Sequence, residues 1–195
     1  MAVVGIMALL AVVGVPAIKG LTGSGGRKQA LAQVLGAFEV ARNTAISSGT
    51  NAAVIFPDGT FASGDSYKYR SMAVVVYNPT NSASPATMVG PWIVLPQGIA
   101  FFPKSLVNSN LPSATNVSVR VLTTTINRTF PAVVFQPDGG LADGFTPTPT
   151  NGIAFFEGTI TNNNETNLSS RMTNFETVRL TRYTGRAMAT MAPAP

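Results

Sequence analysis

The chain begins with an apolar run that needs a partner. Its first eighteen residues, MAVVGIMALLAVVGVPAI, carry no charge, and the first charged side chain is Lys19. A helix formed by this run is apolar on every face, because no polar stripe recurs at helical spacing. Such a helix is buried in lipid or packs against another apolar helix. The run therefore predicts contact with a membrane or with copies of itself.

Two other interpretations of this run stay open. About 20 apolar residues are needed to cross a bilayer, so the run is short for a complete span. A secretory signal peptide normally carries Lys or Arg before its apolar core, and only Met1 precedes this one. The sequence Val15-Pro16-Ala17 would be a poor cleavage site. A core helix is the third alternative, but it would usually keep one polar face. We favour lipid contact.

The composition indicates an exported, β-rich domain rather than a cytosolic enzyme. The 195 residues are 45% hydrophobic, enough for one domain with an appendage, and only 11% are charged. The chain has neither Cys nor His, which excludes disulfides, the usual zinc sites and catalysis through Cys or His. The eight acidic residues are scattered, and Asp138 with Asp143 offers too few ligands for a calcium loop. We expect no enzyme activity, no catalytic residue, no cofactor and no metal.

Residues 20–49 divide into a glycine-rich stretch and an amphipathic helix. The sequence GLTGSGG at 20–26 predicts a hinge or a locally melted segment. From 27 to 49, apolar residues recur at the i, i+3, i+4 spacing of one helical face, and Gly49 is placed to cap the helix. This face consists of Leu31, Val34, Leu35, Phe38, Ala41, Ala45 and Ile46. We expect it to lie along a sheet.

From residue 51 the pattern changes to short β-type runs separated by Pro, Gly, Asn and Ser. Strands are expected near 52–56, 72–77, 92–95, 99–102, 117–122, 132–136, 153–157, 177–183 and 186–190. Polar loops are expected at 78–90 and 161–174, and the Pro-Asp-Gly sequences at 57–59 and 137–139 predict hairpin turns. The predicted organisation is an apolar helix at 1–19, a hinge at 20–26, an amphipathic helix at 27–49, a β-rich domain at 50–190 and a tail at 191–195.

The order of these features resembles the type IV pilin and pseudopilin superfamily. The run VVGIMALLA at 3–11, followed by Pro16, resembles the apolar helix of that family. Within the superfamily, the chain is most similar to minor pseudopilins of the GspH and FimT type. The segments that carry this similarity are AQVLGAFEVARNTAISSG at 32–49, WIVLPQGI at 92–99, FQPDG at 135–139 and TGR at 184–186. None of these motifs is specific alone, but their order is.

The resemblance implies an α+β, pilin-like fold in which a long N-terminal helix, with an apolar half, a glycine hinge and an amphipathic half, packs on a β-rich domain of antiparallel sheets. It implies a structural subunit of a type II secretion or type IV pilus filament that assembles with other pilin or pseudopilin subunits through this helix. The helix would cross the bacterial inner membrane once, contact its lipid before assembly and leave the domain in the periplasm. The residues expected to form the membrane and assembly helix are Val3, Val4, Ile6, Leu9, Leu10, Val12, Val13 and Pro16.

Precursors of this superfamily carry features that do not lie in the printed sequence. These are a short basic leader, a peptidase site after a Gly and a glutamate early in the mature protein, whose first residue is methylated. The resemblance therefore implies that the leader and about two helical turns are missing from the sequence, and two interpretations stay open: Met1 is not the true start, or this member has lost the processing of its relatives.

Two alternative functions follow from the charge and from the opening run. The formal charge of +5 permits nucleic-acid binding, and some FimT-type minor pilins serve in DNA uptake through basic residues near the C-terminus. Arg182 and Arg186 would be the contacts here, although Arg179 and Arg182 on one strand would point to opposite faces. The second alternative is an exported β-rich binding module whose opening run is a signal peptide, with a soluble product that starts after Ala17.

Overall fold

The computed structural model describes residues 2–59, 61, 67–78, 86–103, 117–121, 124–128, 130–142, 152–161, 164–167 and 175–192. Within these ranges, the side chains of 2–24, 117–128, 161–167 and 191–192 are outside the description.

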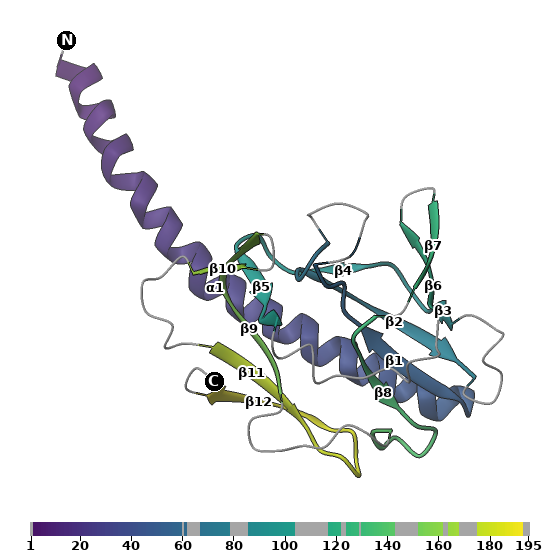
Figure 1. Ribbon diagram of the computed structural model, residues 1–195. Helices are drawn as coiled ribbons and strands as arrows, with labels where there is room; N and C mark the ends of the chain where they lie inside the picture. The colour runs from purple at the N-terminus through teal and green to yellow at the C-terminus, as the bar shows by residue number, and fades with distance from the viewer. Residues whose placement is uncertain are drawn as a thin grey trace.

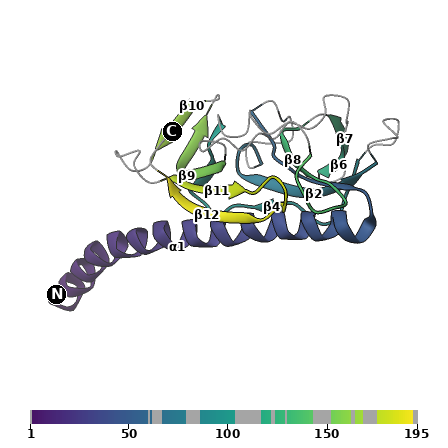
Figure 2. The same cartoon turned by 90° about the horizontal axis from the view of Figure 1, so that it is seen from below.

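A single long helix, α1 (Ala2–Ser48), forms the N-terminal part of the chain. It continues without a break through 20–26, so the local melting expected there does not occur, and flexing of this stretch stays a prediction. The helix ends where Gly49 adopts φ of +62°, a left-handed conformation that glycine takes at little cost. Its C-terminal half lies along the β-strands, whereas its N-terminal half projects away from them (Figures 1 and 2).

The buried face of α1 differs in part from the expected one. Among the side chains of α1 that the structure describes, those of residues 25–48, the buried ones are Ala30, Val34, Ala37, Phe38, Ala41 and Ala45. Leu31 and Leu35 are only half-buried, and Ile46 is 45% exposed. Four of the six buried residues are alanines, which allow the helix backbone to approach the strands closely. The spacing thus predicted the helix correctly, but packing turned the buried face toward its small residues.

The larger sheet contains seven strands. Its hydrogen-bonded order is β7 (Thr124–Arg128), β6 (Val117–Val121), β3 (Ala86–Met88), β2 (Ser71–Tyr77), β1 (Asn51–Ile55) and β8 (Ala132–Phe135), with β4 (Ile93–Val94) also paired to β2. Of the described pairs in this sheet, only that of β3 with β6 is parallel.

The smaller sheet contains five strands and is antiparallel. Its order is β10 (Asn164–Asn167), β9 (Ile153–Thr161), β11 (Phe175–Leu180) and β12 (Ala187–Ala192), with β5 (Ile99–Phe101) also paired to β9. Both sheets contact α1. The α+β, pilin-like arrangement that the sequence predicts is confirmed.

Three strands lie where the sequence analysis expected none. β3 falls within the expected loop 78–90, β10 falls within the expected loop 161–174, and β7 follows β6 after a short connection. The strands β7 and β10, TTINR and NETN, are polar and form ladders with β6 and β9. Their pairing, rather than an apolar pattern, makes them strands. β12 also extends past the expected boundary at 190.

Two of the three hydrophobic clusters among the described residues meet at β1, whose five residues are all buried. Ala52 and Val54 belong to the cluster on the helix side, and Ala53 and Ile55 belong to the cluster on the other side. Side chains alternate between the two faces of a strand, so β1 is covered on both. In the helix-side cluster, the ring of Phe38 has its centroid 6.4 Å from that of Phe56 and 6.2 Å from that of Phe135. The cluster on the other side contains a group of aromatic rings in mutual contact, those of Phe61, Tyr67, Trp92 and Phe130.

The two Pro-Asp-Gly sequences fold differently. The second forms the expected turn, in which the Gly139 amide donates to the Gln136 carbonyl at 2.9 Å and Gly139 has φ of +83°. The first does not form a tight hairpin. β1 and β2 are paired neighbours, but residues 56–70 connect them, and the Pro57 carbonyl accepts from the Tyr69 amide at 2.8 Å. The backbone pairing of Pro57 with Tyr69 therefore leaves a long connection between β1 and β2 instead of a tight turn.

Candidate functional site

The predicted membrane and assembly helix is the projecting part of α1. The backbone of 2–24 is helical, and the side chains of the residues assigned to this role are outside the description. Across the part of the chain that the structure describes, no helix offers an apolar stretch of the length that a membrane crossing requires. The assigned roles of these residues stay predictions.

The β-rich domain contacts α1 at the end of the glycine-rich stretch, at Gly26 and Arg27. A Cβ at Gly26 would lie 3.6 Å from Ile99 Cγ1 and 3.8 Å from Pro96 Cβ, which is ordinary van der Waals contact. One residue later, Arg27 Nε forms an ion pair with Glu157 Oε1 at 2.9 Å. Both side chains are about one-quarter exposed, so the pair contributes little stability of its own. These contacts mark the point at which the helix leaves the domain.

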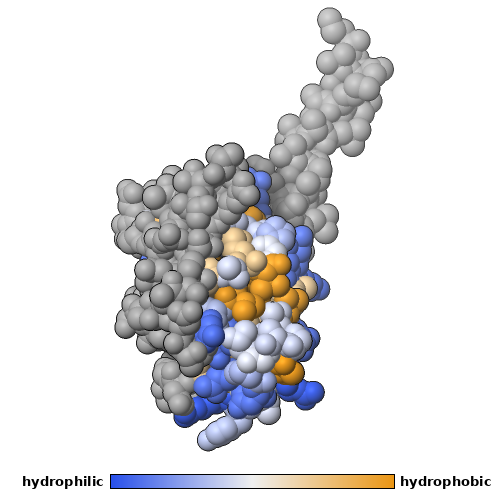
Figure 3. Space-filling model, turned by 90° about the vertical axis from the view of Figure 1, so that its right-hand side faces the viewer, coloured by the Kyte–Doolittle hydropathy of each residue, from blue (hydrophilic) through white to orange (hydrophobic). Residues whose placement is uncertain are grey.

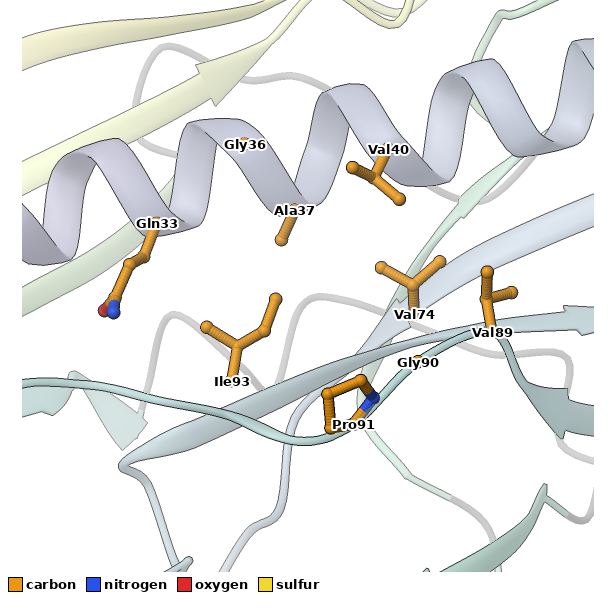
Figure 4. Close-up of a pocket in the computed structure, with 9 residues that line it drawn as sticks. All are labelled: Gln33, Gly36, Ala37, Val40, Val74, Val89, Gly90, Pro91 and Ile93. Carbon is orange, nitrogen blue, oxygen red and sulfur yellow. The ribbon is translucent and has the colours of Figure 1, made fainter.

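An open apolar groove lies between α1 and the larger sheet (Figure 4). Its volume is about 350 Å³. One wall is formed by the helix and the other by β2, by the segment after β3 and by β4. The residues that line the groove are Gln33, Gly36, Ala37, Val40, Val74, Val89, Gly90, Pro91 and Ile93. We call this feature the apolar groove.

Exposed valines extend the apolar groove onto the surface. Val40 and Val89 line it and are 50% and 47% exposed. Hydrophobic residues also gather on the face of the domain seen in Figure 3. The apolar groove thus has two half-exposed valines at its edge.

A second candidate surface is the turn between β11 and β12, which we call the basic turn (181–186). It contains Arg182 and Arg186, together with Tyr183, whose side chain is 85% exposed. The Thr181 amide donates to the Arg186 carbonyl at 2.9 Å, and the Gly185 amide donates back to the Thr181 carbonyl at 2.7 Å. The turn thus holds both arginines within one closed loop.

This arrangement corrects the earlier expectation for Arg182. β11 ends at Leu180, so Arg182 lies in the turn and not on a strand with Arg179. Arg179 stays on β11, half-buried, and its Nε is buried without a hydrogen-bond partner. The prediction that Arg179 and Arg182 point to opposite faces of one strand is therefore wrong, because Arg182 is not on the strand.

The acidic residues show no arrangement suited to metal binding in the described ranges, which contain no group of three His, Cys, Asp or Glu that could hold an ion. Asp138 Oδ1 accepts a hydrogen bond from the Gly140 amide at 2.8 Å, which is a turn-stabilising role. Asp143, its expected partner, lies outside the described residues.

The apolar groove was not predicted from the sequence, because its walls come from separate parts of the chain. The helix wall uses positions 33, 36, 37 and 40, the i, i+3, i+4, i+7 spacing of one face. The opposite wall includes 89–90, inside a segment that was expected to be a polar loop. The one sequence feature that could have indicated the groove is the group of small or uncharged residues Gly36, Ala37 and Val40 on the helix.

A model of the family described as type II transport protein GspH matches residues 30–174. No curated protein and no solved structure matches the chain. The matched range includes every residue that lines the apolar groove, and it ends before β11 and the basic turn.

Proposed function

Because this chain belongs to the type II transport protein GspH family, we propose that it is a structural minor pseudopilin. It would be a subunit of a type II secretion or type IV pilus filament and would assemble with other pilin or pseudopilin subunits through its N-terminal helix. Before assembly the helix would rest in the bacterial inner membrane, with the β domain in the periplasm.

One observation supports this proposal: a single helix joins an uncharged segment to a segment that packs against the β-sheets. Residues 2–18 carry no charge, and the same helix continues into the face buried on both sheets. The uncharged part projects from the strands (Figure 2). An apolar helix must be surrounded by lipid or by other apolar helices. A subunit can therefore enter a filament when its helix leaves the lipid and packs against the helices of other subunits.

The first test is the intact mass and the N-terminal sequence of the protein recovered from membranes of its native cells. A membrane-bound product that retains residues 1–18 behind a processed, methylated start supports the proposal. A soluble product that starts after Ala17 contradicts it and would leave the exported binding module as the function.

A pair of variants separates the role of the helix from general damage. Leu10→Lys places a charge within the uncharged run and should abolish membrane retention and filament incorporation. Ala32→Lys places the same charge on an exposed position of the packed half and should leave both intact. Equal behaviour of the two variants would count against the proposal. The assay is fractionation of membranes and sheared filaments from cells that carry their own secretion or pilus system.

The basic turn supports a second candidate function, nucleic-acid binding in DNA uptake. Arg182 and Arg186 share one turn with Tyr183, an exposed ring that can stack on a base. Fluorescence anisotropy with a short DNA duplex should then show binding that weakens as salt rises. The double change Arg182→Ala and Arg186→Ala should abolish it, and Lys28→Ala, also exposed, should not. Absence of binding at low salt would end this candidate.

A further inference from the structure

We propose that the outer edge of β12 binds an extended segment of another protein, which adds to the smaller sheet as one more antiparallel strand and ends in an acidic group beside Arg186. This inference goes beyond the proposed function and does not depend on it. Three observations support it: the lack of protection of this edge, the direction of its backbone groups and the charges at its two ends.

β12 differs from the other three strands that end the two hydrogen-bonded orders. β8 is covered on its outer side, where the Ala142 amide donates to the Val134 carbonyl at 3.0 Å. β7 and β10 each include a charged residue, Arg128 and Glu165. β12 reads AMATMA, without a charge or a proline, and β11 is its one paired strand among the described residues. Natural edge strands are protected by charge, proline or a covering segment, so an edge without them is open to pairing with another chain.

The backbone groups of β12 face outward at every second residue. The Thr181 amide donates to the Arg186 carbonyl at 2.9 Å, so these two residues begin the ladder as a hydrogen-bonded pair. Such pairs recur at every second position of an antiparallel ladder, which makes Met188 and Thr190 the next residues of β12 that bond to β11. The residues that direct their N–H and C=O groups away from β11 are then Ala187, Ala189 and Met191. A partner strand would find donors and acceptors there at the spacing of its own backbone.

The side chains of this edge leave room for a partner. Ala189 is exposed, and the side chain of Met188 is 57% exposed. Side chains directly opposite each other on neighbouring strands lie about 5 Å apart, so β-branched side chains of a partner can pack beside the small alanines and the methionine. β12 lies at the lower border of the smaller sheet in Figure 1, and Figure 2 is seen from that side.

The charges at the two ends of β12 select the direction and the chemistry of the partner. Arg186, directly before the strand, is exposed, and Arg182 lies in the same basic turn. At the other end, Glu176 on β11 is opposite Met191. A strand antiparallel to β12 begins beside Glu176 and ends beside Arg186, so an acidic C-terminal end is attracted and an acidic N-terminal end is repelled. The two ends lie about 17 Å apart at about 3.4 Å per residue, more than the screening length of about 8 Å in physiological salt, so each acts separately.

A synthetic peptide tests this contact. The probe is fluorescein-labelled Thr-Val-Thr-Val-Thr-Asp with a free C-terminal carboxylate, titrated with the purified full chain in detergent micelles and followed by anisotropy. We expect saturable binding that weakens as salt rises. The control peptide ends in Lys amide instead of Asp and should bind about fivefold more weakly or worse, since it loses one exposed ion pair. N-methyl groups on one set of alternate residues should abolish binding, and on the other set they should be tolerated, because only one set of amides faces β12.

A pair of variants at one position tests the edge itself. Ala189→Pro removes an outward amide, which a strand edge tolerates, so the variant should fold but lose the peptide. Ala189→Val keeps this amide and should bind like the parent. Arg186→Ala should weaken binding about fivefold, and Lys28→Ala, also exposed, should not. Parent-like binding by a folded Ala189→Pro variant would overturn the inference.

Amide hydrogen exchange of the unmodified chain decides the question independently of any variant. Saturating peptide should slow exchange of the outward amides of Ala187, Ala189 and Met191 about tenfold or more. The amides of Met188 and Thr190, already bonded to β11, should change little. Protection confined to the basic turn would show an electrostatic contact alone and overturn the inference. Protection that appears without peptide and rises with protein concentration would show pairing with a second copy and overturn the choice of partner. A DNA duplex that binds where the peptide does not would assign the arginines to nucleic acid and also overturn it.

Discussion

Arg42 Nε donates a hydrogen bond to the carbonyl oxygen of Thr184 at 2.7 Å and ties the helix to a turn 142 residues later in the chain. The same guanidinium lies beside Gly139, where an added Cβ would be 3.3 Å from Arg42 Nε. The end of α1 is therefore in contact with the turn after β8 and with the basic turn.

Arg42→Ala should lower the free energy of unfolding by about 1 kcal/mol, the typical net value of one hydrogen bond. Thermal unfolding of the full chain, followed by circular dichroism, would then shift down by about 2–4 °C. Asn43→Ala, at the exposed neighbouring position, is the control and should leave the midpoint unchanged or slightly higher. Equal midpoints for Arg42→Ala and the parent would show that the tie to Thr184 contributes nothing.

Two Gly→Ala changes should have effects of opposite sign. Gly185 has φ of +60°, and an added Cβ would collide with the Gly139 carbonyl and lie 3.0 Å from the Phe135 ring. Gly185→Ala should therefore destabilise the chain by about 2 kcal/mol or more, through strain and overpacking. Gly36→Ala adds a methyl in open space on a helix and should stabilise it by about 1 kcal/mol. Urea unfolding measures both, and the same sign for both would contradict this reading of the two glycines.

Among the described side chains of α1, Phe38 is the largest that is fully buried. Its side chain is 1% exposed and contacts the rings of Phe56 and Phe135. Phe38→Ala should cost about 3–5 kcal/mol, since it removes a buried ring and leaves a cavity. Val40→Ala, two residues along the same helix and 50% exposed, should cost about 0.5 kcal/mol or less. A small loss for Phe38→Ala, measured by urea unfolding, would mean that the helix is not held through this cluster.

Tyr77 should make the fold sensitive to alkali. Burial raises the pKa of its phenol above the ordinary 10.0, although the hydrogen bond that Asn51 Nδ2 donates to the hydroxyl, at 3.4 Å, lowers it in part. The unfolded chain therefore loses this proton first, and stability falls as the pH rises above 10.0. Below that pH both states keep the proton, and the group adds no pH dependence.

The measurement is urea unfolding of the parent and of Tyr77→Phe on both sides of that pKa. The variant should lose less stability than the parent between neutral and strongly alkaline pH. Tyr183→Phe, at a ring that is 85% exposed, serves as the control and should follow the parent. If Tyr77→Phe and the parent lose the same stability, burial of this phenol is not the cause of any alkaline sensitivity.

Much of the fold was predictable because its signals are local. The apolar spacing after residue 27 identified the packed half of α1, and Gly49 ended it as expected. The runs of β1 and β2 were recognised because β-branched and apolar residues lie between turn residues. Motifs in a fixed order also identified the family that the match over 30–174 shows.

Other features were not predictable, because their cause lies far away in the chain. β10 reads NETN, and it is a strand only because β9 offers a free edge. The first Pro-Asp-Gly sequence did not close a tight hairpin, because the Pro57 carbonyl accepts a hydrogen bond from the amide of Tyr69, twelve residues later in the chain. Neither outcome can be read from the few residues around each site.

Local patterns in the sequence were enough to predict an uncharged helical segment that must be buried, a following helical segment with an apolar face, and a domain of short strands. These properties depend on the periodicity of neighbouring residues. Packing in three dimensions was needed to show that the buried face of α1 is its alanine side, that the position of Gly36 faces open space, and that Arg182 lies in a turn rather than on a strand. Segments that are distant in the sequence determine which side chains are buried and which face open space. The residues around each position do not reveal which distant segment will pack there.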